Sequence, residues 1–278
     1  MNARQFNSTD NLQRVASGCR TAALMALVLV GVVVPAVPAS AAERLRRLAP
    51  PEEVIIRMEE RFQQQLAALD SYRDLRRYSV AHALLGDGTY WVVEENFSAP
   101  DNKCFEVLER GGSGAVQRRV FARLLEVEQE TAREAVRPLV DLSRHNYNFT
   151  YLGFDETANA YRFEATPRGK NEYLLRGTIW VSAEDFAVTR IEGEPAKRHS
   201  ILIQRVRFVH QFAKFGEFWF PVHHRSETKL RLFGTATLEI DYSEYQWQAR
   251  SPSGAGEHAM ASALDTSDRN DRIQGGKQ

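Results

Sequence analysis

The stretch that decides the fold is residues 203–247, with the sequence IQRVRFVHQFAKFGEFWFPVHHRSETKLRLFGTATLEIDYSEYQW. Two short turns, at 216–217 and 233–234, divide it into three segments of strand character. Short connections favour antiparallel neighbours, and the segments exceed the about five or six residues of an ordinary strand. A strand of this length is on the order of 40 Å long. The stretch therefore predicts a strongly curved antiparallel sheet.

The side chains of this stretch separate into one charged and one apolar face. In 218–232 the odd positions from His223 to Arg231 are charged or polar, and the even positions are mostly apolar or small. Because successive side chains of a strand point to opposite faces, the apolar sides should face inward together. From the pattern alone, the simpler interpretation is that the covering helices pack against the small residues on this face; the alternative is that these residues leave room for an apolar ligand. The candidate cavity residues are Phe208, Phe212, Val222, Ser226, Thr228, Leu230, Leu238 and Ile240.

The rest of the chain supplies two helices and further strands. Apolar residues recur every three or four positions in 51–72 and in 116–136, which is the pattern of a helix that packs one face on a core. The remaining strand candidates begin near residue 75 and lie at 90–97, 103–109, 146–154, 161–166, 172–182 and 186–192. We therefore expect an α+β fold: a strongly curved antiparallel sheet, an incomplete barrel of about ten strands, with two helices covering its concave side.

The N-terminal segment has the layout of a secretory signal peptide. Arg4, Arg14 and Arg20 precede an apolar run at 22–34, and Ala39-Ser40-Ala41 matches a small-residue cleavage pattern. The competing interpretation is an uncleaved anchor, but the run is shorter than the about twenty residues of a membrane span. We expect a signal peptide at 1–41, a single domain at 42–249 and a disordered tail at 250–278.

Composition and motifs argue against several other classes of protein. Thirty-six basic and thirty-six acidic residues balance, so the chain lacks the surplus of basic residues that is typical of nucleic-acid binding. Of the two cysteines, only Cys104 follows the expected cleavage site, and we expect it to be a half-buried free thiol on a strand. His210 and His224 could approach each other on the inward face, but no carboxylate completes a metal site, so satisfied core histidines are expected. Glu94-Glu95 and Glu239/Asp241 suggest solvated strand faces. We expect no catalytic set, metal or cofactor.

Three segments resemble the LolA-like superfamily of periplasmic outer-membrane lipoprotein-sorting and carrier proteins. These are LRGTIWVSAED at 175–185, VTRIEG at 188–193 and the turn FGEFWFP at 215–221. The resemblance implies an incomplete antiparallel barrel whose hydrophobic cavity holds acyl chains. It also implies an arginine near the cavity mouth, for which Arg76 and Arg77 are candidates by position.

These observations favour a periplasmic carrier that is not an enzyme. It would shelter lipid or lipoprotein acyl chains and exchange them with a transfer partner at the inner or outer membrane. Each methylene group moved out of water is worth about 0.8 kcal/mol, so such a carrier needs no catalytic group. The alternative is a periplasmic sensor or scaffold that binds a protein partner with the same fold.

We expect the signal peptide to be removed after Ala41, because a small-residue pattern follows a short apolar run there. N-terminal sequencing of the exported protein should begin at Ala42. A retained Met1 together with fractionation into the membrane would contradict cleavage and support the anchor.

Overall fold

The computed structural model describes residues 48–82, 88–197, 202–232 and 234–251. The expected signal peptide lies outside these ranges, as does the expected tail from residue 252 onward. Within them no helix is long and apolar enough to cross a membrane.

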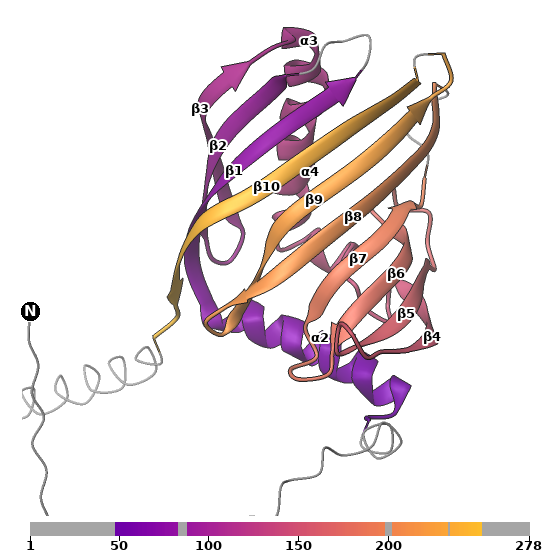
Figure 1. The fold of residues 1–278 in the computed structure, drawn as a ribbon. Helices are drawn as coiled ribbons and strands as arrows, with labels where there is room; N and C mark the ends of the chain where they lie inside the picture. The colour runs from indigo at the N-terminus through magenta and orange to yellow at the C-terminus, as the bar shows by residue number, and fades with distance from the viewer. Residues whose placement is uncertain (1–47, 83–87, 198–201, 233, 252–278) are drawn as a thin grey trace, which may run out of the picture. The chain divides into compact units, whose positions relative to one another are not determined.

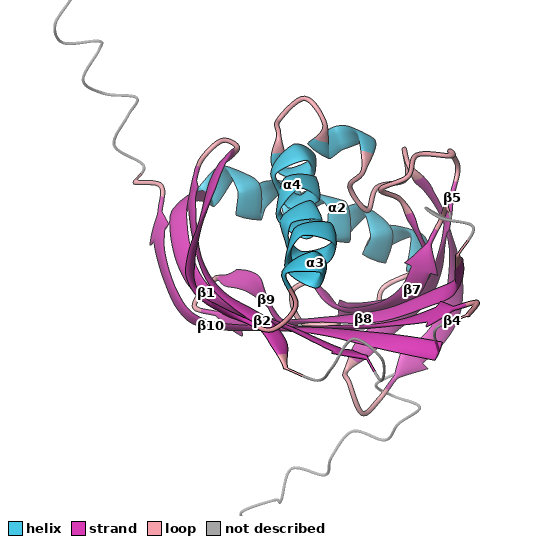
Figure 2. Cartoon of the chain, turned by 90° about the horizontal axis from the view of Figure 1, so that it is seen from above, coloured by secondary structure: helices cyan, strands magenta, loops and turns pink. Residues whose placement is uncertain are grey.

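Ten strands form one antiparallel sheet, as the sequence predicts (Figure 1). Their spatial order is β3-β2-β1-β10-β9-β8-β7-β6-β5-β4. The strands are β1 (Leu69–His82), β2 (Thr89–Ser98), β3 (Asn102–Gly111), β4 (Tyr147–Asp155), β5 (Ala160–Pro167), β6 (Leu175–Ser182), β7 (Val188–Pro195), β8 (Ile203–Phe215), β9 (Phe218–Leu230) and β10 (Gly234–Ala249). The sheet curves around the helices without closing, since β3 and β4 remain at its two edges (Figure 2).

The helices lie on the concave side of the sheet (Figure 2). Helix α2 (Pro51–Ala68) precedes β1, and the connection from β3 to β4 contains α3 (Gly114–Val116), a π-helical turn η1 (Gln117–Phe121), α4 (Ala122–Ala132) and a 3-10 turn η2 (Arg137–Leu139). Because β3 and β4 form opposite edges, this connection has to run from one edge of the sheet to the other. The expectation of two helices covering the concave side is confirmed.

Each helical segment buries its own hydrophobic cluster. Val54, Ile55 and Met58 of α2 pack with buried residues of β4 to β7, such as Phe163 and Ile179. The second segment packs against β1, β2 and β10 instead, with a cluster built from Tyr78, Val80, Trp91, Val93, Val116, Phe121 and Ile240. The concave face is thus covered in two halves.

Several sequence-based boundaries were wrong. The first helix ends at Ala68 rather than near residue 72, because β1 begins at Leu69 and its inward positions include the charged Asp74 and Arg76, which hide the strand pattern. The second helix is broken into α3, η1 and α4 and does not reach residue 136. Cys104 is a free thiol, but it is exposed rather than half-buried.

Glycine permits an unusually close approach of β6 to β7. Gly177 lies opposite Gly193 in the ladder, and a Cβ atom added to Gly177 would lie 1.9 Å from the backbone oxygen of Glu192. No neighbouring side chain could move to relieve that overlap, since the obstructing atom belongs to the backbone.

We therefore predict that Gly177→Ala lowers the free energy of unfolding by about 1–3 kcal/mol, the usual cost of overpacking. Gly169→Ala is the matched control, because a Cβ there would meet only Leu174 Cδ1 at 4.0 Å. Chemical denaturation of both variants measures the difference. Equal midpoints for the two would show that the strands can separate freely at this point.

Candidate functional site

An apolar cavity of about 350 Å³ lies between α2 and the sheet. Its walls come from α2, from the segment after η2 and from β4, β6, β7, β8 and β9. The lining includes Met58, Phe62, Val140, Leu142, Leu175, Ala187, Val188, Ile191, Phe212 and Trp219. The volume falls near the lower end of the about 300–1,000 Å³ that is typical of small-molecule sites.

A few polar groups accompany this apolar lining. Arg61, Gln65 and Asp141 reach the cavity together with Tyr147 and Tyr173. Tyr147 is buried, and its hydroxyl accepts a hydrogen bond from the Leu175 amide at 3.2 Å. A mostly apolar cavity with few polar groups suits a ligand that has a long apolar part and one polar end.

Hydrogen bonds hold α2 against the cavity wall. The amide of Gln65 donates from Nε2 to the Trp219 carbonyl oxygen at 3.0 Å and accepts from the Trp219 N–H at 2.9 Å. Arg61 donates to the carbonyl oxygen of Glu217 in the same turn. These bonds satisfy backbone groups of the β8–β9 turn and fix the helix at one end of the cavity.

Asp185 holds the Trp219 side chain in place by a hydrogen bond. Its carboxylate accepts hydrogen bonds from Trp219 Nε1 at 2.9 Å and from Lys214 Nζ at 2.7 Å. Partial burial alone would raise the pKa of Asp185, but the hydrogen bonds from Lys214 and Trp219 outweigh burial and lower it. The carboxylate therefore stays charged and keeps the indole in place.

A second feature of the concave face is a buried charge cluster under α4. Arg76 of β1 is 1% exposed and pairs with Asp74 at 2.7 Å, with Glu95 of β2 and with Glu128 of α4 at 2.8 Å. Lys103 of β3 bridges the two glutamates, at 2.8 Å from Glu95 and 2.7 Å from Glu128. The cluster ties the crossing helix to three strands.

Burial and charge act in opposite directions on these carboxyl groups. Burial raises the pKa of Asp74 and of Glu95, where the neighbouring negative charge of Glu128 adds to the effect. Burial also opposes ionisation of Glu128, but Lys103 and Arg76 outweigh it and lower its pKa. Burial likewise disfavours the charged form of Arg76, yet its three carboxylate neighbours raise its pKa well above the usual value. Arg76 and Glu128 thus remain an ion pair.

Two histidines meet on the inward face, as their shared parity predicts. Nδ1 of His210 lies 3.2 Å from Nδ1 of His224, and the rings pack among Phe208, Phe212 and Tyr242. Burial lowers the pKa of His210 to about 3 and that of His224 to about 4. Both rings are neutral near pH 7, where one nitrogen can donate to the other. The expectation of satisfied core histidines is wrong for one ring nitrogen, because the buried Nε2 of His210 has no hydrogen-bond partner among the described residues.

The residues expected to line a cavity are spread over the concave face. Phe212 lines the cavity beneath α2, and Phe208 stacks on His224. Ile240 is buried in the cluster under α4, with Leu238 packed against it. Ser226 is buried, whereas Val222, Thr228 and Leu230 are half-buried. The structure therefore brings only Phe212 to the cavity, and the wider set stays a prediction.

Sequence reasoning missed the charge cluster and most of the cavity. Glu95 was expected on a solvated face beside Glu94, but it is fully buried, because it lies directly opposite Asp74 on the inward side. Arg76 contacts α4, whereas Arg77 lies over the ring of Tyr90 outside the cluster. Alternation of charged residues with Tyr78 and Val80 was the available signal. Across the described ranges no group of three or more His, Cys, Asp or Glu residues is placed to hold a metal ion.

Comparisons with known proteins give distant similarities. A family model described as a family of unknown function (DUF5686) matches residues 110–245, just under half of the chain. No curated protein matches the sequence. Among solved structures, a LolA superfamily protein from Nitrosomonas europaea is 11% identical with a TM-score of 0.40, and covers 73% of this chain and 96% of its own.

Two further solved structures have the same level of similarity. An outer membrane lipoprotein-sorting protein domain from Vibrio parahaemolyticus is 12% identical with a TM-score of 0.43, covering 77% of this chain and 98% of its own. A DUF1329 family protein from Desulfovibrio piger is 13% identical with a TM-score of 0.39, covering 72% and 94%. With TM-scores below 0.5, none of these structures decides the function of this chain.

We predict that Arg76→Met lowers the free energy of unfolding by about 3–5 kcal/mol, because it leaves the buried carboxylate of Asp74 without its ion-pair partner and Glu95 with Lys103 alone. Arg77→Met is the matched control on the same strand. The Arg77 side chain is exposed and lies over the Tyr90 ring. Its replacement should change the free energy of unfolding by no more than about 0.5 kcal/mol. Denaturant unfolding monitored by circular dichroism distinguishes the two. Similar losses for both variants would show that the cluster does not stabilise the fold.

Proposed function

We propose that this chain is a periplasmic carrier that binds lipid or lipoprotein acyl chains. The observation that carries the proposal is the apolar cavity beneath α2, with Met58, Leu175, Val188 and Phe212 in its lining. The short apolar run and the Ala39-Ser40-Ala41 pattern support export. An acyl chain in the aqueous periplasm has no other shelter, and burial of each methylene group contributes about 0.8 kcal/mol.

The cavity fits part of a single chain rather than a whole lipid. At about 350 Å³ it is small, and Phe62 at its border is 40% exposed. An acyl chain would insert its apolar end beneath α2 and leave its polar end near Arg61. The ordering of a flexible chain opposes binding, so we expect reversible binding suited to a carrier that must release its cargo.

Seven of the eight lining residues expected from the sequence lie outside this cavity, so the proposal centres on the residues beneath α2. Carriage of this kind requires no catalytic group and no cofactor. A transfer partner at the inner or outer membrane would supply and receive the cargo.

Trp219 lies in the cavity wall and offers a direct test. The bromine atoms of dibromostearate quench indole fluorescence at short range. We therefore expect dibromostearate to quench the tryptophan fluorescence of the protein. Trp219→Phe should remove most of that quenching, because the other tryptophans do not line the cavity. Quenching that survives this substitution would show that the acyl chain binds elsewhere on the protein.

A cavity-filling variant tests affinity separately from location. Val188→Phe should raise the dibromostearate concentration for half-maximal quenching at least tenfold, because the added ring occupies space that the chain needs. Val92→Phe is the control, since Val92 is also a half-buried strand valine but faces away from the cavity. Unchanged quenching in a folded Val188→Phe variant would refute acyl-chain binding at this site.

A further inference from the structure

Two exposed leucines lie at neighbouring strand ends of the sheet. Leu232, in the turn after β9, is 77% exposed, and Leu202, directly before β8, is 53% exposed. These are the largest exposed fractions among the large hydrophobic side chains of the described ranges. The Arg231 N–H donates to the Leu202 carbonyl oxygen at 3.0 Å, which joins the two strand ends. We call Leu202 and Leu232 the leucine tip.

Packing does not explain the leucine tip. Neither leucine belongs to any of the three hydrophobic clusters formed by the described residues. Turns favour Gly, Pro, Asn, Asp and Ser, and four other hairpin turns of this sheet each contain an acidic residue: 99–101, 156–159, 183–187 and 216–217. The turn after β9 has Arg231 and Leu232 and no acidic residue. A single exposed leucine is ordinary, but two on neighbouring strand ends form a small apolar surface.

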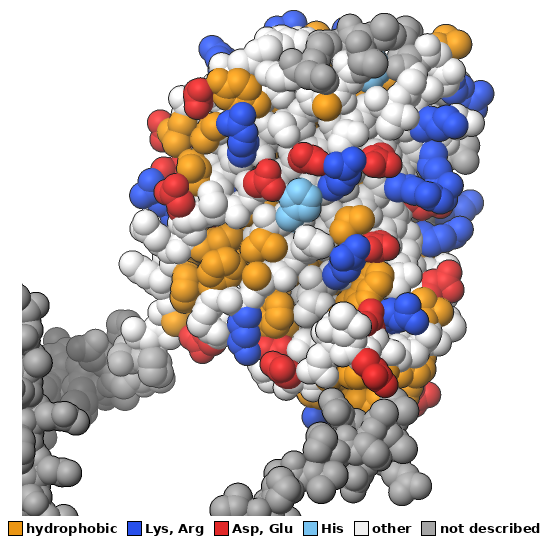
Figure 3. Space-filling model, in the orientation of Figure 1, with side chains coloured by type: hydrophobic (Ala, Val, Ile, Leu, Met, Phe, Trp, Pro, Cys, Tyr) orange, Lys and Arg blue, Asp and Glu red, His pale blue; other side chains and the backbone are white. Residues whose placement is uncertain are grey.

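Exposed basic side chains accompany the leucine tip on the same strand ends. The described residues 196–197, 202–207 and 228–232 contain no acidic residue. Their basic residues are Lys197, Arg205, Arg207, Lys229 and Arg231, all of them exposed. Figure 3 shows a group of Lys and Arg side chains along the upper right-hand margin of the molecule, over the ends of these strands.

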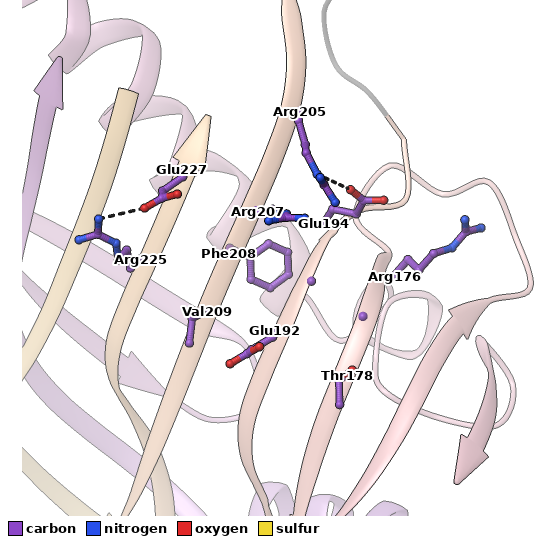
Figure 4. Close-up of a pocket in the computed structure, with 12 residues that line it drawn as sticks. Arg176, Thr178, Glu192, Glu194, Arg205, Arg207, Phe208, Val209, Arg225 and Glu227 are labelled. Atoms are coloured by element: carbon purple, nitrogen blue, oxygen red, sulfur yellow. Dashed lines mark hydrogen bonds and ion pairs between the residues drawn. The ribbon is translucent and has the colours of Figure 1, made fainter. Parts of the chain in front are cut away.

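Most of these cations are not neutralised by the protein itself. Arg205 pairs with Glu194 at 3.6 Å, and Glu227, the one acidic residue of β9, pairs with Arg225 at 3.0 Å. Figure 4 shows both pairs, with Arg207 outside them. Four cations have no ion-pair partner in the described ranges: Lys197, Arg207, Lys229 and Arg231. This end of the sheet therefore attracts anions.

The leucine tip is distinct from the acyl-chain cavity. Trp219 at the start of β9 lines the cavity, whereas Leu232 follows the end of the same strand. At about 3.3 Å per residue, the two lie roughly 40 Å apart along the strand. Figure 1 shows these strand ends on the side of the sheet away from α2. An inference about the leucine tip is therefore independent of acyl-chain binding.

We propose that the leucine tip and its basic neighbours dock this protein on an anionic membrane surface. Leu202 and Leu232 would enter the boundary between headgroups and acyl chains, while Lys229 and Arg231 contact lipid phosphates. Burial of apolar side chains and attraction of Lys and Arg to anionic lipids act together in this kind of binding.

A membrane fits these side chains better than other anionic partners do. A soluble polyanion would satisfy the cations but leave Leu232 in water. A second copy of the chain, related by a twofold axis, would bring the same cations against each other. A membrane provides phosphate groups at the level of the cations and an apolar interior beyond them, so both kinds of side chain find a partner.

Cosedimentation with vesicles tests the proposal on the protein purified after export. We expect binding to vesicles of equal parts phosphatidylglycerol and phosphatidylcholine. The lipid concentration for half-maximal binding should rise about tenfold or more with phosphatidylcholine alone, because the anionic headgroups are absent. Added salt should weaken the binding, because exposed charges are screened. Equal binding to both kinds of vesicle, or binding to neither, would overturn the proposal.

Paired variants locate the contact. Arg231→Glu and Leu232→Ser should each raise the lipid concentration for half-maximal binding about tenfold, because one removes attraction and the other removes apolar burial. Their controls are Arg250→Glu, an exposed arginine beyond the other end of β10, and Leu152→Ser, a 44% exposed leucine on β4. Each control should change that concentration by no more than about twofold.

The pattern of losses decides between the remaining explanations. Loss in Arg231→Glu without loss in Leu232→Ser would show a polyanion surface that does not enter the membrane, and would overturn the proposal. Loss that is equal in variants and controls would show that the vesicle contacts another face, with the same result. Val188→Phe, which fills the acyl-chain cavity, should leave vesicle binding intact. If this variant alone loses vesicle binding, the cavity holds the lipid and the leucine tip does not.

Discussion

The antiparallel pairing of β1 with β10 is the contact on which the rest of the arrangement depends. It brings the first strand and the last strand together in the middle of the sheet, and so it forces β3 and β4 to opposite edges. The chain between them must then cross the concave side, where α4 covers one half. Helix α2 enters just before β1 and covers the other half. The apolar cavity lies beneath α2, where the helix and the sheet leave space between them.

The two halves are held by different kinds of force. Apolar packing dominates beneath α2, whereas α4 has no fully buried residue. Its Leu124 and Leu125 are partly buried against the second cluster, and its Glu128 joins Arg76 and Lys103. Taking charges out of water is costly, so apolar residues of similar volume often stabilise a fold as well as a buried ion pair does, whereas removal of one partner of the pair is strongly destabilising. The crossing helix is therefore positioned by directional contacts, and the cavity is shaped by the packing of α2 and the sheet.

The sequence was sufficient for the sheet but not for the site. Alternation over 203–247 predicted the long strands and the inward face, and recurrence of apolar residues predicted α2, because both patterns are local. The charge cluster was missed because Asp74, Arg76 and Glu95 interrupt apolar alternation and resemble solvated positions until the pairing of β1 with β2 places them together. The cavity could not be read from one stretch, since Met58, Leu142, Val188 and Trp219 meet only through tertiary packing. A local signal for the close approach of β6 to β7 did exist in Gly177 and Gly193, but a glycine does not say which strand comes close.

The amide of Gln65 has a consequence for how the cavity can open. Its two hydrogen bonds to the N–H and C=O of Trp219 reproduce, from a helix side chain, the pairing that a neighbouring strand would make. The contact is made to backbone, so it does not depend on the identity of the side chain at position 219. Any motion that lifts this end of α2 must expose the Trp219 amide to solvent. The hydrogen-exchange rate of that single amide is therefore a measure of how often the helix leaves the sheet.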